Sequence, residues 1–249
     1  LNGFVTGCTM LFLSITPNAS AMSSGGLELL TIKIQQMIIE STNNNTATSP
    51  AITYSECYSA LFLKPEILCH PHIPKPLHGV APREIKGQNW WDETRQKAYK
   101  STDYHCVACG VAKSEAKKHK WLEAHEFWDI DYNTGICEVK SIEPLCHYCH
   151  NFIHSGRLSM IVGKEKSKQE VIDILEHGFK VLAENNLKAF YFTVDFAKRI
   201  GARTFGVEKY TPIVNEKLKW TDFKLIFEGN EYFSKFKSQS EWQSFYNAL

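Results

Sequence analysis

The sequence lacks a large net charge, a long hydrophobic run and a dense set of cysteines. Its 28 Lys and Arg nearly balance its 27 Asp and Glu, so the whole chain is not a basic protein. The apolar stretch at residues 4–15 is shorter than the roughly 20 residues that a membrane-spanning helix needs. Eight cysteines in 249 residues are too sparse for the disulfide framework of a small secreted protein. We therefore expect an ordinary globular, cytoplasmic protein that does not enter a membrane.

The beginning of the chain also lacks a signal-peptide pattern. No Lys or Arg precedes Lys33, so the positively charged segment that opens a signal peptide is missing. We interpret residues 1–21 as a tail or a translation artefact, and initiation at Met22 is one way to explain it. The alternative interpretation is that residues 1–21 direct secretion of the protein.

Residues 22–82 are expected to form an N-terminal segment that ends in a proline-rich linker. Residues 27–40 fit either a helix or a buried strand, because β-branched side chains are frequent there. Residues 41–50 are polar and rich in turn formers, which is typical of a linker. Five prolines between residues 64 and 82 predict extended chain without a regular element.

Residues 83–160 are predicted to fold as strand, strand and helix. The elements expected there are a helix at 90–100, strands at 121–128 and 136–142 joined by a turn at 133–135, and a helix at 146–154. Residues 83–120 carry nine basic side chains against five acidic ones. This local excess favours a nucleic-acid surface, although a solvated lysine face is the simpler alternative.

Residues 161–249 are expected to form a C-terminal region of helix, hairpin and helix. Ser167 and Glu170 form a capping box for a helix at 168–184. In that helix the apolar face is made by Val171, Leu175, Gly178 and Leu182. Residues 224–233 predict a hairpin that turns at Gly229–Asn230, and Ser238 with Glu241 predicts a short terminal helix.

Four of the cysteines form two C-x-x-C pairs, Cys106 with Cys109 and Cys146 with Cys149. A two-residue spacer lets both thiolates of a pair face one ion, and two pairs complete a tetrahedral shell of four sulfurs. Such a shell selects zinc, or less often an iron–sulfur centre. Because no coordination position stays open, we expect a structural zinc. The remaining cysteines, Cys8, Cys57, Cys69 and Cys137, have no partner at ligand spacing and are expected to be small core residues.

Three histidines next to the second pair predict another metal site. His150 and His154 are four residues apart, so they lie on the same face of a helix. His125 lies in the first predicted strand, which packs against that helix in a strand–strand–helix unit. Three imidazoles would leave coordination positions open, as a catalytic ion requires. The alternative is three unrelated core or surface histidines.

At about residues 95–158 the sequence resembles the HNH endonuclease family. The resemblance rests on Tyr104–Gly110 (YHCVACG), on Leu122–His125 (LEAH) and on Pro144–His150 (PLCHYCH), which continues to His154. The fold of that family is the ββα-metal, or His-Me, finger. The resemblance therefore implies an α+β fold in which a zinc-bound ββα-metal (HNH) finger is embedded between α/β flanking segments.

The resemblance also implies roles for individual residues. In that family a strand supplies a metal-binding His followed by a general-base His, a later loop supplies Asn, and the helix supplies the last metal-binding His residues. His125 falls on the first position, and His150 and His154 fall on the helix pair. Two positions depart from the pattern: Glu126 stands in place of the general base, and Ser141 stands in place of the Asn.

The departure at Glu126 leaves several hypotheses open. A carboxylate can accept the proton of an attacking water, so Glu126 would be the base. It could instead bind the metal ion, with His125 as the base. The third hypothesis is that catalysis has been lost, leaving a zinc-containing module that binds nucleic acid or another protein.

The implied reaction is metal-assisted hydrolysis of phosphodiester bonds. The resemblance implies a structural Zn²⁺ and a second, catalytic divalent ion, which would be Mg²⁺, Mn²⁺ or Zn²⁺. DNA is the expected partner, and RNA is the alternative. Four basic residues are expected to hold the nucleic-acid backbone. They are Arg95, Lys117, Lys118 and Arg157.

Overall fold

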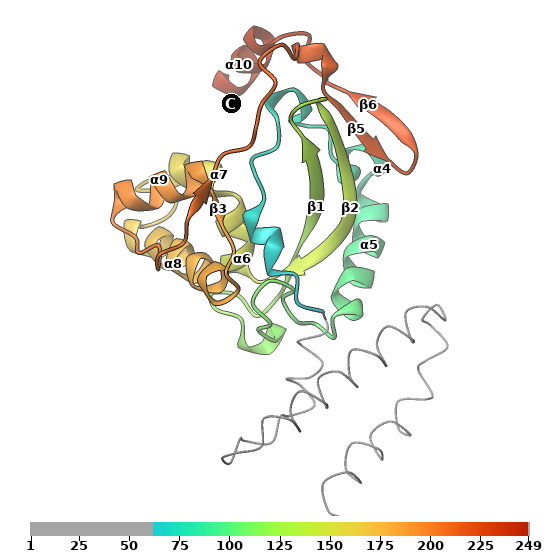
Figure 1. The fold of residues 1–249 in the computed structure, drawn as a ribbon. Helices are drawn as coiled ribbons and strands as arrows, with labels where there is room; N and C mark the ends of the chain where they lie inside the picture. The colour runs from blue at the N-terminus through green and yellow to red at the C-terminus, as the bar shows by residue number, and fades with distance from the viewer. Residues whose placement is uncertain (1–61, 249) are drawn as a thin grey trace, which may run out of the picture. The chain divides into compact units, whose positions relative to one another are not determined.

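The computed structural model describes residues 62–248, and a two-stranded antiparallel hairpin lies at the centre of these residues (Figure 1). β1 (Glu123–Asp131) pairs with β2 (Ile136–Leu145), with His125 opposite Glu143. Asp131 holds the connecting turn, because its carboxylate accepts hydrogen bonds from the Asn133 amide at 2.8 Å and the Thr134 hydroxyl at 2.7 Å. The predicted strands and turn are confirmed, but β1 begins two residues later than predicted and both strands end three residues later.

A second hairpin extends this sheet on the β2 side. β5 (Lys224–Phe227) runs parallel to β2, and β6 (Asn230–Phe233) runs antiparallel to β5, giving the order β1-β2-β5-β6. The predicted hairpin is confirmed, but its turn is Glu228–Gly229 rather than Gly229–Asn230, because Asn230 already pairs with Phe227. Both turn residues have positive φ, 49° and 75°, as a two-residue hairpin turn requires.

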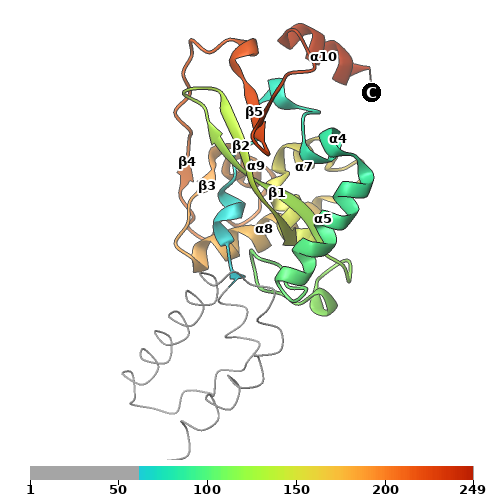
Figure 2. The same ribbon diagram turned by 90° about the vertical axis from the view of Figure 1, so that its right-hand side faces the viewer.

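Helices cover the two faces of the β1–β2 hairpin. On one face lies α5 (Gln88–Ser101) (Figure 2). This helix buries Trp91, Ala98 and Tyr99. On the other face lies α6 (His147–Ile153), and α8 (Lys168–Glu184) packs behind it. The predicted order of strand, strand and helix is therefore confirmed, and the described residues have a mixed α+β fold.

The packing of α6 on α8 explains a glycine in the middle of a long helix. Ser167 caps α8 by accepting a hydrogen bond from the Glu170 amide at 3.1 Å, as predicted. The expected apolar face is buried, and Gly178 lies on it. A Cβ at Gly178 would come within 2.1 Å of the Phe152 ring of α6, so only glycine allows this close approach.

The proline-rich stretch differs from the prediction of extended chain without regular elements. It contains the 3-10 helices η2 (Pro65–Cys69) and η3 (Lys75–Leu77), and α4 (Pro82–Lys86) begins at its last proline. In each of these elements a proline occupies the first or second position. The missing N–H of proline costs nothing there, and its fixed φ favours a helical start.

The remaining elements complete the described part of the chain. They are η4 (Lys113–Glu115), α7 (Ser155–Ile161), β3 (Ala189–Phe190), α9 (Tyr191–Ile200), β4 (Lys209–Tyr210), η5 (Trp220–Asp222) and α10 (Gln239–Asn247). Ser238 caps α10 as predicted. Among residues 62–248, none of the helices has the length and apolar character needed to cross a membrane. The expectations for residues 1–21, 27–40 and 41–50 lie outside the described residues.

Candidate metal centres

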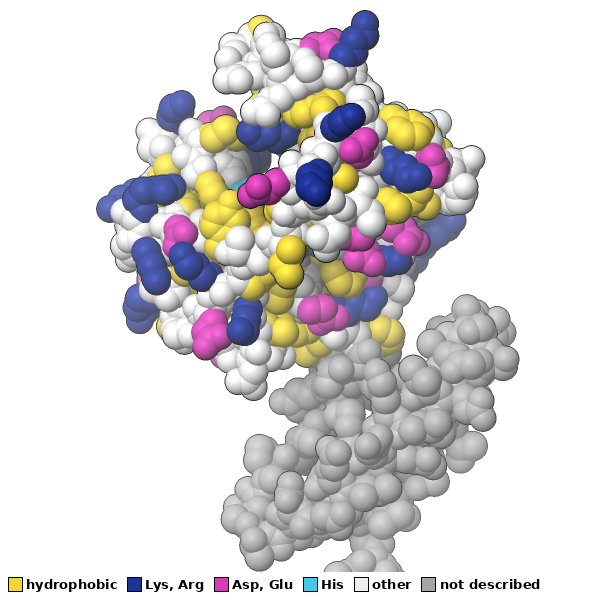
Figure 3. Space-filling view, turned by 45° about the horizontal axis from the view of Figure 1, so that its top comes forward, with side chains coloured by type: hydrophobic (Ala, Val, Ile, Leu, Met, Phe, Trp, Pro, Cys, Tyr) yellow, Lys and Arg dark blue, Asp and Glu magenta, His cyan; other side chains and the backbone are white. Residues whose placement is uncertain are grey.

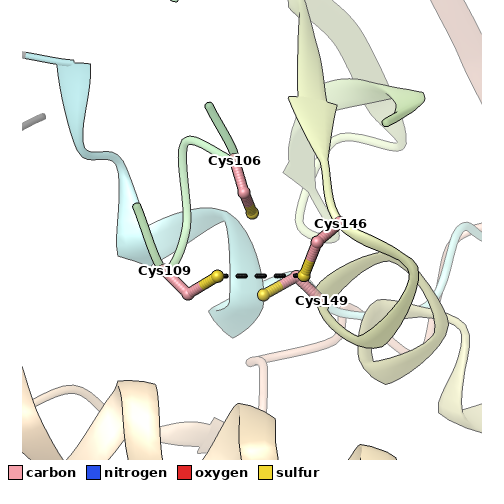
Figure 4. Close-up of side chains that lie close together, drawn as sticks. All are labelled: Cys106, Cys109, Cys146 and Cys149. Carbon is pink, nitrogen blue, oxygen red and sulfur yellow. Dashed lines mark hydrogen bonds between the residues drawn. The ribbon is translucent and has the colours of Figure 1, made fainter. Parts of the chain in front are cut away.

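The two predicted cysteine pairs converge on one point (Figure 4). Cys106 and Cys109 lie in the loop after α5, while Cys146 follows the last residue of β2 and Cys149 lies on α6. The four sulfur atoms all lie within 4.8 Å of one another, and those of Cys109 and Cys146 are 3.8 Å apart. None of the six described cysteines forms a disulfide. The group could therefore hold a metal ion such as zinc in a four-sulfur shell.

The surroundings favour the thiolate, the form that binds metal, at two of the four sulfurs. Hydrogen bonding from Cys106 lowers the pKa of Cys109 to about 6 and lowers the pKa of Cys146 below its usual range. Burial instead raises the pKa of Cys106 and Cys149. Without a metal ion, the negative charge therefore lies on Cys109 and Cys146 rather than on Cys106 and Cys149. A cation at the centre of the group would stabilise all four as thiolates.

His177 of α8 also contacts this group, and the sequence analysis missed it. Its Nε2 lies 3.3 Å from the sulfur of Cys149 and 4.0 Å from that of Cys146. Burial alone would lower the pKa of His177, but its hydrogen bonds with Cys109 and Cys146 outweigh burial and raise it to about 9. His177 is therefore a cationic donor beside the sulfurs. It lies 28 residues after Cys149 in the chain, so only the packing of α8 on α6 brings it there.

The three predicted histidines form a second group. His125 comes from β1, His150 from α6 and His154 from the residue after α6, and their ligand nitrogens all lie within 4.8 Å of one another. The His154 ring centroid is 4.9 Å from that of His125 and 4.7 Å from that of His150. The structure thus brings together the three residues at metal-ligand spacing, as predicted.

The burial and protonation of these imidazoles are suitable for metal binding. His125 is 3% exposed, and its Nε2 is buried without a hydrogen-bond partner. An orphaned buried nitrogen costs about 1–3 kcal/mol, which a ligand bond would offset. Burial also lowers the pKa of His125 well below its usual value and that of His154 to about 3. Both rings are therefore neutral near pH 7, with lone pairs free to bind a cation.

Glu123 connects this group to a further histidine. Its carboxylate accepts a hydrogen bond from His147 Nδ1 at 2.7 Å and another from His150 Nδ1. Burial alone would raise the pKa of Glu123, but these two bonds outweigh it and lower it to about 2. With Nδ1 bound to Glu123, the Nε2 of His150 is the atom directed to the other histidines. Carboxylates orient metal-binding histidines in this way.

An open cavity of about 230 Å³ lies beside the three histidines. His150, His154 and Glu123 line it together with Arg157 and Lys166. The Nζ of Lys166 lies 3.4 Å from His147 Nε2 and 2.7 Å from a Glu170 oxygen. The lining therefore combines imidazoles and two cations with two carboxylates, those of Glu123 and Glu165, and the cations can contact an anionic group such as a phosphate ester. Sequence reasoning missed Glu123, His147 and Lys166, because their roles depend on contacts between separate elements.

Glu126 and Ser141 lie apart from this cavity. Successive strand residues point to opposite faces, so Glu126 lies on the α5 face, opposite the face of Glu123 and His125. Its carboxyl does not belong to the three-histidine group, and burial raises its pKa. Ser141 donates a hydrogen bond of 2.6 Å to Glu143 and does not line the cavity.

The four basic residues predicted to hold a nucleic-acid backbone each have a different partner. Arg157 lines the cavity, 3.6 Å from a Glu165 oxygen. Arg95 pairs with Asp92 at 2.8 Å, and Lys118 pairs with Glu170 at 2.9 Å. The ammonium of Lys117 lies 5.7 Å from the centre of the Tyr148 ring. On the face shown in Figure 3, basic and acidic side chains are interspersed.

The cysteines outside the C-x-x-C pairs agree with the core prediction where the structure describes them. Cys137 is fully buried in the cluster around Leu225. Cys69 is partly buried and packs against the main core. Burial raises the pKa of Cys137 to about 12 and of Cys69 to about 11, so both stay protonated. Cys8 and Cys57 lie outside the described residues.

Comparison with protein-family models, with curated proteins and with solved structures found no match for this chain.

Proposed function

We propose that this protein is a metal-dependent endonuclease of the HNH type that hydrolyses phosphodiester bonds in DNA. One observation carries the proposal: α6 joins the four-cysteine group to the three-histidine group, through the neighbouring residues Cys149 and His150. A closed sulfur site next to an open nitrogen site on one strand–strand–helix unit is the arrangement expected of a zinc-bound ββα-metal finger.

His125, His150 and His154 would hold the catalytic ion, and Cys106, Cys109, Cys146 and Cys149 would hold a structural zinc. When bound, the catalytic ion supplies charge that polarises the scissile phosphate and neutralises the leaving oxygen. Three imidazoles suit Zn²⁺ best and Mg²⁺ least, because Mg²⁺ prefers oxygen ligands. Arg157 and Lys166 line the same cavity and would contact the phosphate oxygens.

His147 is a second candidate for the general base, beside Glu126. Glu123 accepts the His147 Nδ1 proton, which leaves Nε2 as the atom that can accept a proton from water. His147 lines the cavity, whereas Glu126 lies on the opposite face of β1. The Lys166 ammonium lies 3.4 Å from this Nε2, so an attacking water would compete with it for the Nε2 lone pair.

A catalytically inactive zinc module is the competing function. The position of Glu126 on the α5 face and of Ser141 outside the cavity favours it, because both stand where the family pattern has catalytic groups. Such a module would bind nucleic acid or another protein through the same scaffold and would not cut. RNA is the alternative nucleic acid, since phosphate contacts do not distinguish the two.

Incubation of supercoiled plasmid with purified protein tests the proposal. We expect nicked or linear DNA with Mn²⁺ or Zn²⁺ and weaker cutting with Mg²⁺. His154→Ala should abolish cutting while retaining one zinc per chain, and His78→Ala, a histidine outside both groups, is the matched control. A wild-type protein that carries its zinc and leaves DNA and RNA intact with every one of these ions would overturn the nuclease assignment.

A further inference from the structure

A second cleft, separate from the metal groups, lies between α5 and the segment that enters β1. Its volume is about 300 Å³. Its lining combines aromatic rings with cations and consists of Arg95, Gln96, Tyr99, Tyr104, Lys113, Trp121 and Leu122. This volume is at the lower end of the range for small-ligand pockets, so the cleft takes a single planar group rather than a duplex.

Trp121 is the most exposed ring at this cleft. The residue is 52% exposed, although an indole is one of the costliest side chains to leave in water. One face of the ring stacks on His119, with 4.0 Å between ring centroids and 8° between planes. The stack holds the indole in place and leaves a large rigid surface open to solvent. A preorganised exposed aromatic is the platform that proteins use to stack nucleic-acid bases.

Cations surround the aromatic rings of the cleft. The Lys113 ammonium lies 5.5 Å from the centre of the Tyr104 ring, and Arg95 lies in the lining beside Tyr99. Lys120 precedes Trp121 and is exposed. Asp92 offsets part of this charge through its 2.8 Å pair with Arg95. The remaining cations are placed to attract the phosphates on either side of a stacked base.

The cleft is linked to the cavity of the three histidines. Trp121 and Glu123 are two residues apart, about 7 Å along an extended chain. His119 stacks on Trp121 with one ring face, and its centroid lies 4.7 Å from that of His147, which lines the cavity. A base on Trp121 would therefore lie next to the phosphate that occupies the cavity.

We propose that this cleft binds an unpaired base of single-stranded DNA, with Trp121 as the stacking platform. The inference rests on the proposed function, because it names the substrate form of the same site. A base within a duplex is stacked on both faces by its neighbours and cannot reach the indole. The protein accordingly prefers single strands, or duplexes with unpaired bases, to continuous duplex.

Binding measured without cleavage tests this site. The probe is a fluorescein-labelled oligodeoxythymidine, compared with a duplex of equal length, by anisotropy without added divalent ion. Trp121→Ala should weaken single-strand binding by about 5- to 150-fold, as expected for about 1–3 kcal/mol of stacking per base. Trp121→Phe should keep most of the affinity. Phe233→Ala, on β6 at the opposite edge of the sheet and 57% exposed, is the control for loss of an exposed aromatic.

Two further readouts separate stacking from a structural role. The salt dependence of binding should be the same in Trp121→Ala and wild type, because no charge changes. Tryptophan fluorescence of the wild type should be quenched by the oligonucleotide, and Trp121→Phe should lose that quenching. Equal single-strand affinity of Trp121→Ala and wild type, or equal losses on single strand and duplex, would overturn the inference.

The same assays keep this inference distinct from the proposed function. Strong Trp121-dependent binding to single strands without any cleavage would support base binding in the cleft and refute the proposed nuclease activity. If duplex and single strand are cleaved at equal rates and Trp121→Ala does not change them, base binding in the cleft is refuted and the proposed nuclease activity is retained.

Discussion

The Nε2 atom of His177 lies 3.3 Å from the sulfur of Cys149. The two residues belong to different helices, α8 and α6, so this contact joins the packing of the core to the electrostatics of the four-cysteine group. A zinc with four thiolates carries a net charge of −2, and buried charge is costly unless it is paired. A donor or cation from His177 reduces that cost, and it explains why a basic side chain lies in an otherwise apolar helix interface.

Replacement of His177 by Phe should therefore weaken zinc binding. Groups that hydrogen-bond to metal ligands typically change affinity by about 10- to 100-fold, so a loss of that size is expected. Competition with a chromophoric chelator measures the affinity, and His177→Gln, which keeps an N–H donor without charge, should fall between the two. His78→Phe is the control, because His78 packs on Trp242 away from the sulfurs. Equal zinc affinity in His177→Phe and wild type would show that the contact is incidental.

Loss of one sulfur should have a larger effect. Cys106→Ser should abolish stoichiometric zinc and unfold the region around α6, because structural zinc contributes on the order of 10 kcal/mol to folding. Metal content by mass spectrometry and thermal unfolding measure the two effects. Cys137→Ser is the matched control, since Cys137 is equally buried but belongs to no metal group. It should keep its metal while losing some stability. If iron rather than zinc is found in the wild type, the four-sulfur group holds an iron–sulfur centre.

The general base can be assigned by three substitutions. If His147 is the base, His147→Gln should lower cleavage by about 10²–10⁴-fold, while Glu126→Gln should cut at nearly the wild-type rate. Glu123→Gln should lower cleavage and also weaken binding of the second ion, because Glu123 contacts both His147 and His150. Cleavage rates together with calorimetric metal titrations measure these effects. If Glu126→Gln greatly lowers the cleavage rate and His147→Gln leaves it unchanged, Glu126 is the general base.

The pairs of Glu170 with Lys166 and Lys118 should make stability depend on pH. Hydrogen bonds from these two lysines, Lys166 first, lower the pKa of Glu170 in the folded state. A carboxyl with a lowered pKa stabilises the fold above its unfolded value near 4.5, and this contribution disappears as pH falls through the folded value. Glu170→Gln should lose about 1 kcal/mol at pH 7 and less at pH 3. Denaturant unfolding of both proteins at the two pH values checks this. A loss that is the same at both would point to packing instead of charge.

Local sequence signals predicted the metal-bearing unit well. The C-x-x-C pairs, the spacing of His150 and His154, and the cap at Ser167 each depend on a few neighbouring residues, and each is found as predicted. Contacts between distant segments were not predictable in the same way. Nothing near His177 in the sequence indicates a cysteine partner, and nothing in the hairpin β5–β6 indicates that it pairs with β2. Closely spaced prolines predict extended chain, yet a helix tolerates proline at its first or second position. The sequence alone does not show that prolines of this stretch occupy such positions.

Cys149 and His150 are adjacent in the chain, so the two metal groups are not thermodynamically independent. A metal ion in the four-cysteine group would anchor the first half of α6, and the directions of His150 on that helix and His154 at its end would depend on this anchor. Loading should therefore have an order: the sulfur group fills first and raises the affinity of the histidine group for its own ion. By reciprocity, the second ion should raise the affinity of the sulfur group for the first by the same factor. A chelator would then inactivate the protein in two stages. The ion of the histidine group would be lost first and reversibly, and removal of the ion from the sulfur group would then unfold α6 irreversibly.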